Sequence, residues 1–486
     1  MVHKLENIRF ILNHSVVNAP SHPGMLALDY VRQVFQLTGT KQGCKEGDCG
    51  ACNVILGELD ADGFVQYKPI TSCLLPMGEL VGKHLVTIEG LNGPELSPVQ
   101  SAMVECGGTQ CGYCTPGFVV AMTAGLMAPK LPLNEEGLMY AIGGNLCRCT
   151  GYRSIKEAGM QAINSLASKL QGKDRIRALC ESGGLPEYFL KIPDQLKALA
   201  AEGDLNVDAV VPDLSKTTFI SGGTDWYVQR GEDVFETDIT LLNTKKPVQS
   251  ACERDGYIVM DARMTSEAFA DDPLVKSYLS DVDAYNLLIA SWPVRTRATI
   301  GGNICNASPI ADTTCLLLAL ESELVLSKAG EERVVALKDF YLGYKELNKS
   351  PDEMVVEIRF PKYGSETKVN WEKVSKRRWL DISTVNSALK IEIAGDTVRK
   401  ATLALGGVAA TPLYLPKASE LLSGKQLTMD TVLEMLDVAM TEFKPIGDVR
   451  GSARYKRLLA RQLMLAHFTK LFPEIFEEEA TYAALR

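Results

Sequence analysis

The sequence has few of the features that mark membrane, secreted or nucleic-acid-binding proteins. No apolar run approaches the ~18 residues of a membrane helix, and the longest candidate, residues 118–128, contains Thr and Gly. The first ten residues, MVHKLENIRF, lack the apolar core of a secretory signal. The net charge is -9, whereas nucleic-acid binders usually carry a basic excess. These absences predict a cytoplasmic protein that binds neither membrane nor nucleic acid.

Common catalytic signatures are scarce as well. There is no G-x-G-x-x-G, no Walker G-x-x-x-x-G-K-[ST] and no G-x-S-x-G, so Rossmann, P-loop and serine-hydrolase functions have no support. The few histidines show no metal-site spacing, which favours surface positions or hydrogen-bonded core positions. They are His3, His14, His22, His84 and His467.

What the sequence does contain is cysteine. The 486 residues include 13 cysteines, and most of them lie in one stretch from Cys44 to Cys149. The remaining composition is that of a globular protein, with 46% apolar and 23% charged residues. In a reducing compartment, clustered cysteines indicate metal or redox chemistry rather than disulfides.

The first group consists of Cys44, Cys49, Cys52 and Cys73, which follow the C-x4-C-x2-C…C spacing of a plant-type [2Fe–2S] cluster. Glycines in the loop allow it to bend and allow backbone N–H groups to approach the sulfurs. A structural zinc site is one alternative, although zinc is more often bound by C-x2-C pairs. Incidental core cysteines are another.

The second group consists of Cys111, Cys114, Cys147 and Cys149, which fall in the connections of two predicted helix pairs. A four-helix bundle would bring those connections together at one end. Taken alone, the group suits either zinc or iron–sulfur, and its position after a plant-type motif favours a second cluster. The other five cysteines are predicted to be small buried apolar residues. They are Cys106, Cys180, Cys252, Cys305 and Cys315.

Hydrophobic periodicity predicts a small sheet with one helix in residues 1–92. The expected strands are 8–12, 51–56, 64–70 and 85–91, and the expected helix is 28–35. Residues 93–170 carry four helix-start signals instead. These are Ser97 with Gln100, Thr115 before Pro116, Asn134, and Ser154 with Glu157.

The downstream part is predicted to contain a linker at 171–188 and two further domains at 189–366 and 367–486. Two glycine motifs lie there: FISGGTDW at 219–226, and TIGGN at 299–303 followed by ASPIAD. Each is predicted to be a turn. A Gly-Gly turn can present N–H groups to a pyrophosphate, but it is more often a plain turn. Two such turns in a chain with redox motifs favour a bound cofactor.

Several of these motifs together resemble the xanthine dehydrogenase family. They are TGTKQGCKEGDCGAC, TQCGYCTPG, GGNLCRCTGY, SGGTD, ATIGGNI with ASPIAD, LGGVAATP and GDVRGSARYKRLLARQLM. The chain resembles the small, iron–sulfur and FAD-binding subunit of a split bacterial member. The resemblance implies a multidomain α+β fold: a β-grasp ferredoxin domain, a four-helix [2Fe–2S] domain, an α/β FAD-binding domain of the vanillyl-alcohol-oxidase (PCMH-like) type, and a C-terminal α+β flavoprotein domain.

The resemblance also implies which residues hold the cofactors. The two cysteine groups would hold two [2Fe–2S] clusters. The implied FAD contacts are Phe219, Ile220, Ser221, Gly222, Gly223, Thr224, Asp225, Trp226, Thr299, Ile300, Gly301, Gly302, Asn303, Asp312, Val355 and Lys373. The sequence departs from the family's V/I-R-N pattern before the second glycine motif, where it reads Val294-Arg295-Thr296-Arg297.

The implied function is electron transfer. Electrons from a molybdopterin-binding large subunit, which oxidises xanthine or hypoxanthine in purine catabolism, would pass through the two clusters to FAD and then to NAD+. No residue of this chain would hydroxylate purine, and the expected assembly is a heterotetramer with two copies of each subunit. The alternatives are the same role for another substrate (an aldehyde, nicotinate or another N-heterocycle), a general iron–sulfur flavoprotein module, or a zinc-stabilised scaffold.

Overall fold

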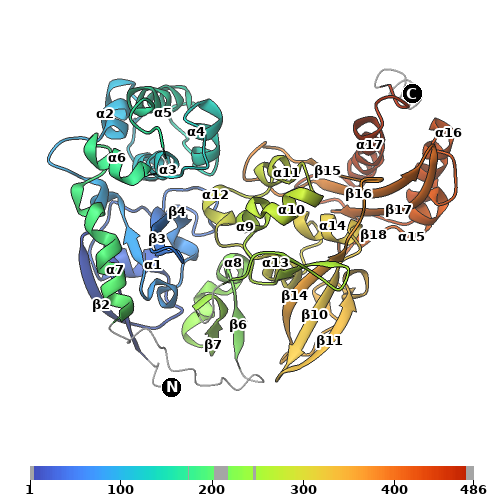
Figure 1. Cartoon of the computed structure of the whole chain (residues 1–486), viewed down its shortest axis with the longest axis horizontal. Coiled ribbons are helices and arrows are strands. Elements are labelled where there is room, and N and C mark those ends of the chain that lie inside the picture. Colours follow the sequence, from blue (N-terminus) through green and yellow to red (C-terminus); the bar gives the residue numbers. More distant parts are fainter. Residues whose placement is uncertain (1–4, 173, 202–216, 245–247, 478–486) are drawn as a thin grey trace. The chain divides into compact units, whose positions relative to one another are not determined.

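The computed structural model describes residues 5–172, 174–201, 217–244 and 248–477 (Figure 1). Parts of the predicted domains 1–92, 189–366 and 367–486 and of the predicted linker 171–188 lie outside the described residues. The chain forms two compact units, each described by itself. The first contains Met1–Lys246 and Ser291–Arg297, and the second contains Pro247–Ala290 and Ala298–Arg486.

The first unit begins with a five-stranded mixed sheet and one helix, α1 (Ala27–Gln33). The central β5 pairs with β1 in parallel, and the other pairings are antiparallel. Phe10 and Val31 are fully buried between the sheet and the helix. The strand order is β2 (Ser15–Ser21), β1 (Glu6–Leu12), β5 (His84–Val86), β3 (Asn53–Leu59) and β4 (Val65–Thr71). The predicted sheet with one helix is confirmed, but the sequence analysis missed β2, whose residues lack regular alternation.

Four helices follow, as predicted, with α2 packed against α5 and α3 against α4. They are α2 (Pro98–Glu105), α3 (Thr115–Met127), α4 (Glu135–Ile142) and α5 (Arg153–Leu166). The capping box of Ser97 with Gln100 and the cap by Asn134 are confirmed. Two other predicted caps are wrong. Helix α3 is preceded by Cys114, so Thr115 lies inside it, and α5 is preceded by Tyr152 in a left-handed conformation, so Ser154 lies inside it.

The first unit continues through α6 (Arg175–Glu181) and α7 (Ile192–Ala201). Helix α6 lies within the predicted linker, and it packs because Leu179 is fully buried in the core of the helical region. A short parallel pair, β6 (Thr218–Ile220) and β7 (Ile239–Leu241), then flanks α8 (Thr224–Arg230). The last piece is α12 (Trp292–Arg295), which returns from the second unit's part of the sequence and contributes Trp292 to the same core.

The second unit contains two antiparallel sheets (Figure 1). The first has the order β11 (Glu331–Ala336), β10 (Glu323–Lys328), β14 (Met354–Pro361), β9 (Tyr257–Asp261) and β8 (Cys252–Arg254). The helices between these strands in the sequence are α9 (Ser266–Asp271), α10 (Pro273–Tyr278), α11 (Val282–Leu288), α13 (Ile300–Asn306) and α14 (Asp312–Ala319), of which α13 contacts β14 of this sheet. The second has the order β15 (Thr367–Val374), β16 (Val385–Ala394), β17 (Thr397–Gly406) and β18 (Leu413–Tyr414). A small hairpin of β12 (Tyr341–Gly343) and β13 (Glu346–Leu347) completes the strands described.

Three C-terminal helices follow the second of these sheets: α17 packs on β15 and β16, α15 packs on β17, and α16 packs on α15 and α17. They are α15 (Pro416–Leu422), α16 (Met429–Ala439) and α17 (Ala453–Leu471). Met464 and Phe468 of α17 are fully buried in the C-terminal core, and Lys456 near the start of the helix is buried as well.

Candidate functional site

The four N-terminal cysteines lie together in the first unit. The thiols of Cys44 and Cys49 share a hydrogen bond, and those of Cys52 and Cys73 share another. Negative charge on Cys44 acts to raise the pKa of Cys52 and that of Cys73, so the two pairs are neighbours. The hydrogen bond from Cys44 lowers the pKa of Cys49 to about 6, and the hydrogen bond from Cys73 lowers the pKa of Cys52. The thiol groups therefore converge in two pairs.

The loop around these cysteines supplies backbone donors to sulfur. The N–H groups of Glu46 and Asp48 each lie 3.3 Å from the sulfur of Cys44, and the Cys44 N–H lies 3.5 Å from that of Cys49. A Cβ atom at Gly43 would come within 2.6 Å of the Cys49 sulfur. Glycine is therefore required at position 43 by the close approach of backbone and sulfur.

The second group also forms two pairs, Cys114 with Cys147 and Cys111 with Cys149. Cys147 and Cys149 lie in the α4–α5 loop, whereas Cys111 and Cys114 precede α3, so the four-helix arrangement brings the predicted residues together. Burial, with a contribution from Cys147, raises the pKa of Cys114 to about 12. Thr150 donates to the sulfur of Cys147 from its N–H at 3.5 Å and its hydroxyl at 3.2 Å.

Each cysteine group supplies four thiols, the number that a [2Fe–2S] cluster shares between its two irons. Cys44, Cys49, Cys52 and Cys73 form the first set of four, and Cys111, Cys114, Cys147 and Cys149 form the second. Both groups therefore have the donor set that such a cluster requires.

The two cysteine groups are joined directly within the first unit. The Leu146 N–H, next to Cys147, donates to the Cys49 carbonyl at 3.0 Å, and the buried Asn145 amide donates to the Gly50 carbonyl at 3.2 Å. A Cβ atom at Gly117 would lie 2.2 Å from the same Gly50 carbonyl. The loop of one group thus packs tightly on the loop of the other.

The first glycine motif, residues 219–226, runs from β6 through a turn into α8 in the first unit. Gly223 has φ +71°, and a Cβ atom there would lie 2.9 Å from the Tyr227 ring, so glycine is required. The Gly222 carbonyl accepts a hydrogen bond from the Arg297 guanidinium at 2.6 Å. The motif is therefore a turn, as predicted, and it is held by a residue distant in sequence.

Three buried donors near this turn have no protein partner among the described residues. They are the Trp226 indole N–H, the Tyr227 hydroxyl and the Arg297 Nε. Buried polar groups normally find partners, so the unpaired Trp226 and Tyr227 donors beside the glycine turn fit an oxygen-rich ligand such as a flavin nucleotide. Sequence analysis missed Tyr227 and Arg297 as site residues. The available signal was the departure at residues 294–297.

The second glycine motif is not a turn, because Thr299 caps α13 by accepting from the Gly302 N–H at 3.2 Å and the helix begins at Ile300. A Cβ atom at Gly301 would lie 2.7 Å from the Ala262 carbonyl, so this glycine permits close packing. The predicted Gly-Gly turn is therefore a helix start. Asn303 accepts from the Thr314 hydroxyl at 3.0 Å, which ties α13 to α14.

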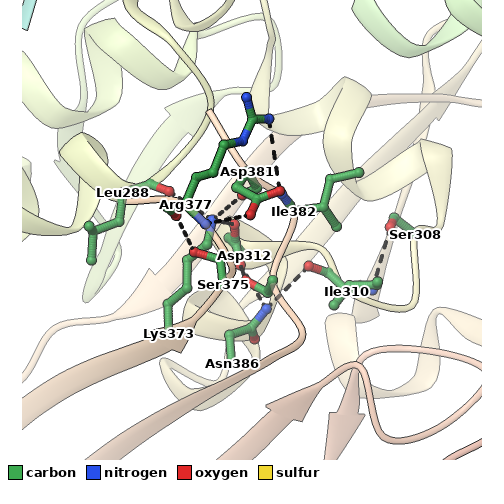
Figure 2. A network of polar contacts seen from close by, with 11 residues as sticks. Leu288, Ser308, Ile310, Asp312, Lys373, Ser375, Arg377, Asp381, Ile382 and Asn386 are labelled. Carbon is green, nitrogen blue, oxygen red and sulfur yellow. Dashed lines mark hydrogen bonds and ion pairs between the residues drawn. The ribbon is translucent and has the colours of Figure 1, made fainter. Parts of the chain in front are cut away.

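Two predicted flavin contacts, Asp312 and Lys373, bind each other in the second unit (Figure 2). The Lys373 ammonium lies 2.8 Å from the Asp312 carboxylate and 2.7 Å from the carbonyls of Leu288 and Asp381. The Lys373 side chain is 1% exposed and that of Asp312 is 12% exposed.

The other oxygen of Asp312 accepts from the Asn386 amide at 2.7 Å (Figure 2). It also accepts from the Ser383 hydroxyl at 2.5 Å. Asn386 reaches further to the Ile310 carbonyl in the ASPIAD segment. This network holds the start of α14 on β15 and β16. Val355, another predicted contact, is half-buried in β14 opposite Leu326.

The remaining cysteines differ in environment, although one interpretation was predicted for all. Cys315 is buried, and Cys106, Cys180 and Cys305 are half-buried. Cys252 is exposed, so the prediction that it is a buried apolar residue is wrong; it lies on edge strand β8, all of whose side chains are exposed.

Three family models match the chain. A [2Fe-2S] binding domain matches residues 87–160, the FAD binding domain in molybdopterin dehydrogenase matches 206–363, and the CO dehydrogenase flavoprotein C-terminal domain matches 372–471. None of the helices within the described ranges has the length and apolar character needed to cross a bilayer.

Curated relatives match over most of the chain. Xanthine dehydrogenase 1 of Arabidopsis thaliana is 28% identical over 92% of this chain, and xanthine dehydrogenase of Oryza sativa is 27% identical over 93%. The chain spans 38% of the length of each relative. A carbon monoxide dehydrogenase structure from Hydrogenophaga pseudoflava is 27% identical with a TM-score of 0.48, covering 55% of this chain and 91% of that one.

Proposed function

Because the chain belongs to the xanthine dehydrogenase family and carries its iron–sulfur and FAD-binding domains, we propose that it is the electron-transfer subunit of a molybdenum hydroxylase. The proposed substrate is xanthine or hypoxanthine, oxidised in a molybdopterin-binding partner subunit. The proposed acceptor is NAD+, the proposed assembly is a heterotetramer of two copies of each subunit, and the proposed location is the cytoplasm. Catalysis of purine hydroxylation is assigned to no residue of this chain.

The thiolates of the two cysteine groups would hold the clusters. When bound, the two clusters would supply one-electron chemistry and FAD would supply two-electron chemistry. The backbone donors of Glu46 and Asp48 would stabilise negative charge on the Cys44 sulfur, and those of Thr150 would do the same at Cys147. Hydrogen bonds to sulfur raise the reduction potential, so these donors tune the electron path.

The chain would bind FAD through the residues that the family resemblance implies. Residues 219–226 would contact the pyrophosphate. The remaining contacts would come from Thr299, Ile300, Gly301, Gly302, Asn303, Asp312, Val355 and Lys373. Since Lys373 already donates to three oxygens, any flavin contact by it would replace one of these bonds.

The pairing of eight cysteines into two groups of two pairs is the observation that carries the proposal. Purified protein should be brown and contain about four irons and four sulfides per chain. Cys49→Ser should remove one of two paramagnetic signals of the reduced protein, because Cys49 belongs to the first group alone.

Cys252→Ser is the matched control, since Cys252 is an exposed thiol outside both groups. It should leave the iron content and both signals unchanged. Bound zinc in a protein without visible absorption would exclude the clusters. The loss of both signals in folded Cys49→Ser protein would exclude two independent sites.

A second candidate function keeps the electron-transfer role but changes the substrate. The matching family models are named for molybdopterin dehydrogenases and CO dehydrogenase rather than for xanthine oxidation, which favours this alternative. Protein co-purified with its native partner should reduce NAD+ in the presence of xanthine. Reduction with an aldehyde or another N-heterocycle, and none with xanthine, would favour the second candidate.

A further inference from the structure

A buried ion pair connects the predicted ferredoxin domain with the first glycine motif. Arg297 donates from one terminal nitrogen to the Glu79 carboxylate at 2.7 Å and from the other at 3.1 Å, so the pair is bidentate. The second nitrogen also donates to the Gly222 carbonyl at 2.6 Å. The side chains of Arg297 and Glu79 are 3% and 5% exposed. All three residues belong to the first unit.

The segment that carries Arg297 is anchored independently of this pair. The Thr296 hydroxyl donates to the Pro69 carbonyl of β4 at 2.9 Å, and Trp292 is buried in the helical core. Glu79 lies in a short 3-10 helix, Met77–Leu80, whose four residues are all buried. Desolvating two charges is costly, and excellent geometry is needed to offset that cost. The Arg297 guanidinium is therefore held in place by its own anchored segment and by the Glu79 carboxylate, and it donates to the Gly222 carbonyl from that fixed position.

The bond to Gly222 determines how the turn presents its backbone. In a trans peptide the carbonyl and the following N–H point in opposite directions. Holding the Gly222 carbonyl on Arg297 thus aims the Gly223 N–H away from the guanidinium. Without that bond the turn could rotate, because glycine adopts many backbone conformations. Burial raises the pKa of the adjacent Tyr227; the charge of Glu79 adds to this rise and the charge of Arg297 opposes it, so both members of the ion pair lie close to Tyr227.

We propose that Arg297, held by Glu79, is a positioning residue for the flavin: it fixes the turn at residues 221–223 in the conformation that receives the FAD pyrophosphate. The inference rests on the proposed FAD-binding function. Preorganisation raises affinity by removing the cost of ordering the turn when ligand binds. Glu79 would therefore influence FAD affinity without contacting FAD.

The test uses the full chain, depleted of flavin and titrated with FAD while flavin fluorescence is recorded. Arg297→Lys keeps the charge but cannot donate to Glu79 and Gly222 in the same planar geometry. It should raise the Kd for FAD by about tenfold or more, since one charge-assisted hydrogen bond is lost. Glu79→Gln should raise it less, because Arg297 keeps its bond to Gly222. The paramagnetic signals of both clusters should remain unchanged.

Arg175→Lys is the matched control, because Arg175 is a buried arginine of the same unit that donates to the Ala128 and Leu131 carbonyls. It should lower the melting temperature but leave the Kd for FAD unchanged. An unaltered Kd in folded Arg297→Lys would overturn the positioning role, as would an equal rise in Arg175→Lys. Failure of the unmodified chain to bind FAD would instead overturn the proposed function.

Discussion

All three acceptors of the Lys373 ammonium group belong to the second unit. It meets one carboxylate oxygen and two carbonyls, while Ser383 and Asn386 occupy the other oxygen of Asp312. Such a network holds α14, the loop before β16 and the end of α11 in one arrangement. A buried charge that loses its partner is costly, because the remaining charge has no water to stabilise it.

We expect Lys373→Met to lower the free energy of unfolding of the second unit by about 3 to 5 kcal/mol, because the Asp312 carboxylate would remain buried without its cation. Urea unfolding followed by circular dichroism measures this loss. Adding Asp312→Asn should restore part of the stability, because the unpaired charge is removed. Strictly additive effects of the two substitutions would contradict the coupling, and Lys328→Met, which breaks an exposed pair with Asp352, should change little.

His467 provides a pH-dependent contribution to stability. It is fully buried between the Asn370 amide and the Ser387 hydroxyl, at 2.8 Å from each, and burial lowers its pKa to about 3. Between that value and the ordinary 6.5, the unfolded chain binds a proton that the folded chain does not. The contribution of His467 to the free energy of unfolding is therefore present in full above pH 6.5 and decreases as the pH falls below that value.

The expected slope is about 1.4 kcal/mol of unfolding free energy per pH unit below 6.5. Urea midpoints at pH 7, 6 and 5 measure it. His467→Gln should make the unfolding of the second unit less dependent on pH over this range. Because His84 in the first unit is also buried, with a pKa lowered to about 4, it should remain a pH-dependent element of that unit in the variant. An identical pH dependence with and without His467 would refute the assignment.

At the scale of elements, two similar motifs have different outcomes. Ser97 and Ser154 are each followed three residues later by Gln or Glu, and each was predicted to begin a helix. Ser97 does so, with both bonds of the capping box formed. Helix α5 begins one residue before Ser154, after a left-handed Tyr152 whose hydroxyl accepts from the Cys147 N–H. The cysteine loop, rather than the local motif, determines where that helix starts.

Ser97→Ala should therefore lower the free energy of unfolding of the first unit by about 1 kcal/mol, the usual effect of losing a helix cap. Ser154→Ala should have almost no effect or a slightly stabilising one, since alanine is the better residue inside a helix. Differential scanning calorimetry of the two variants side by side measures the contrast. Equal destabilisation would show that Ser154 acts as a cap after all.

The contrast between local motifs and tertiary contacts also explains which features could be predicted from the sequence. The strands of the first sheet, the four helices and the grouping of the cysteines follow from local patterns, namely periodicity and spacing. Arg297 and Glu79 could not be paired in advance, because they lie 218 positions apart and only the fold brings them together. Likewise, TIGGN resembles a turn until Gly301 meets the Ala262 carbonyl, a contact that requires tertiary structure.

At the scale of the whole molecule, the chain leaves the first unit after Lys246, returns for Ser291–Arg297 and leaves again. Trp292, in this returning segment, packs in the helical core and against the ring of Tyr140 at 5.6 Å. The first unit therefore depends on a short segment supplied by a distant part of the chain.

We expect Trp292→Ala to lower the stability of the first unit by about 3 to 5 kcal/mol, the usual cost of removing a large buried side chain. Calorimetry should show a shift in one unfolding transition, the one accompanied by loss of cluster absorption. Phe340→Ala, a fully buried residue of the second unit, is the counterpart that should shift the other transition. A Trp292 variant that shifts only the second unit's transition would contradict the assignment of residues 291–297.

The returning segment also bears on biosynthesis. Glu79 is incorporated 218 residues before Arg297, which at about 5 to 20 residues per second corresponds to a delay of about 10 to 45 s. During that interval the nascent first unit has a carboxylate without its cation and a core without Trp292. The N-terminal half of the polypeptide can thus complete its native core only after synthesis has passed well into the other half.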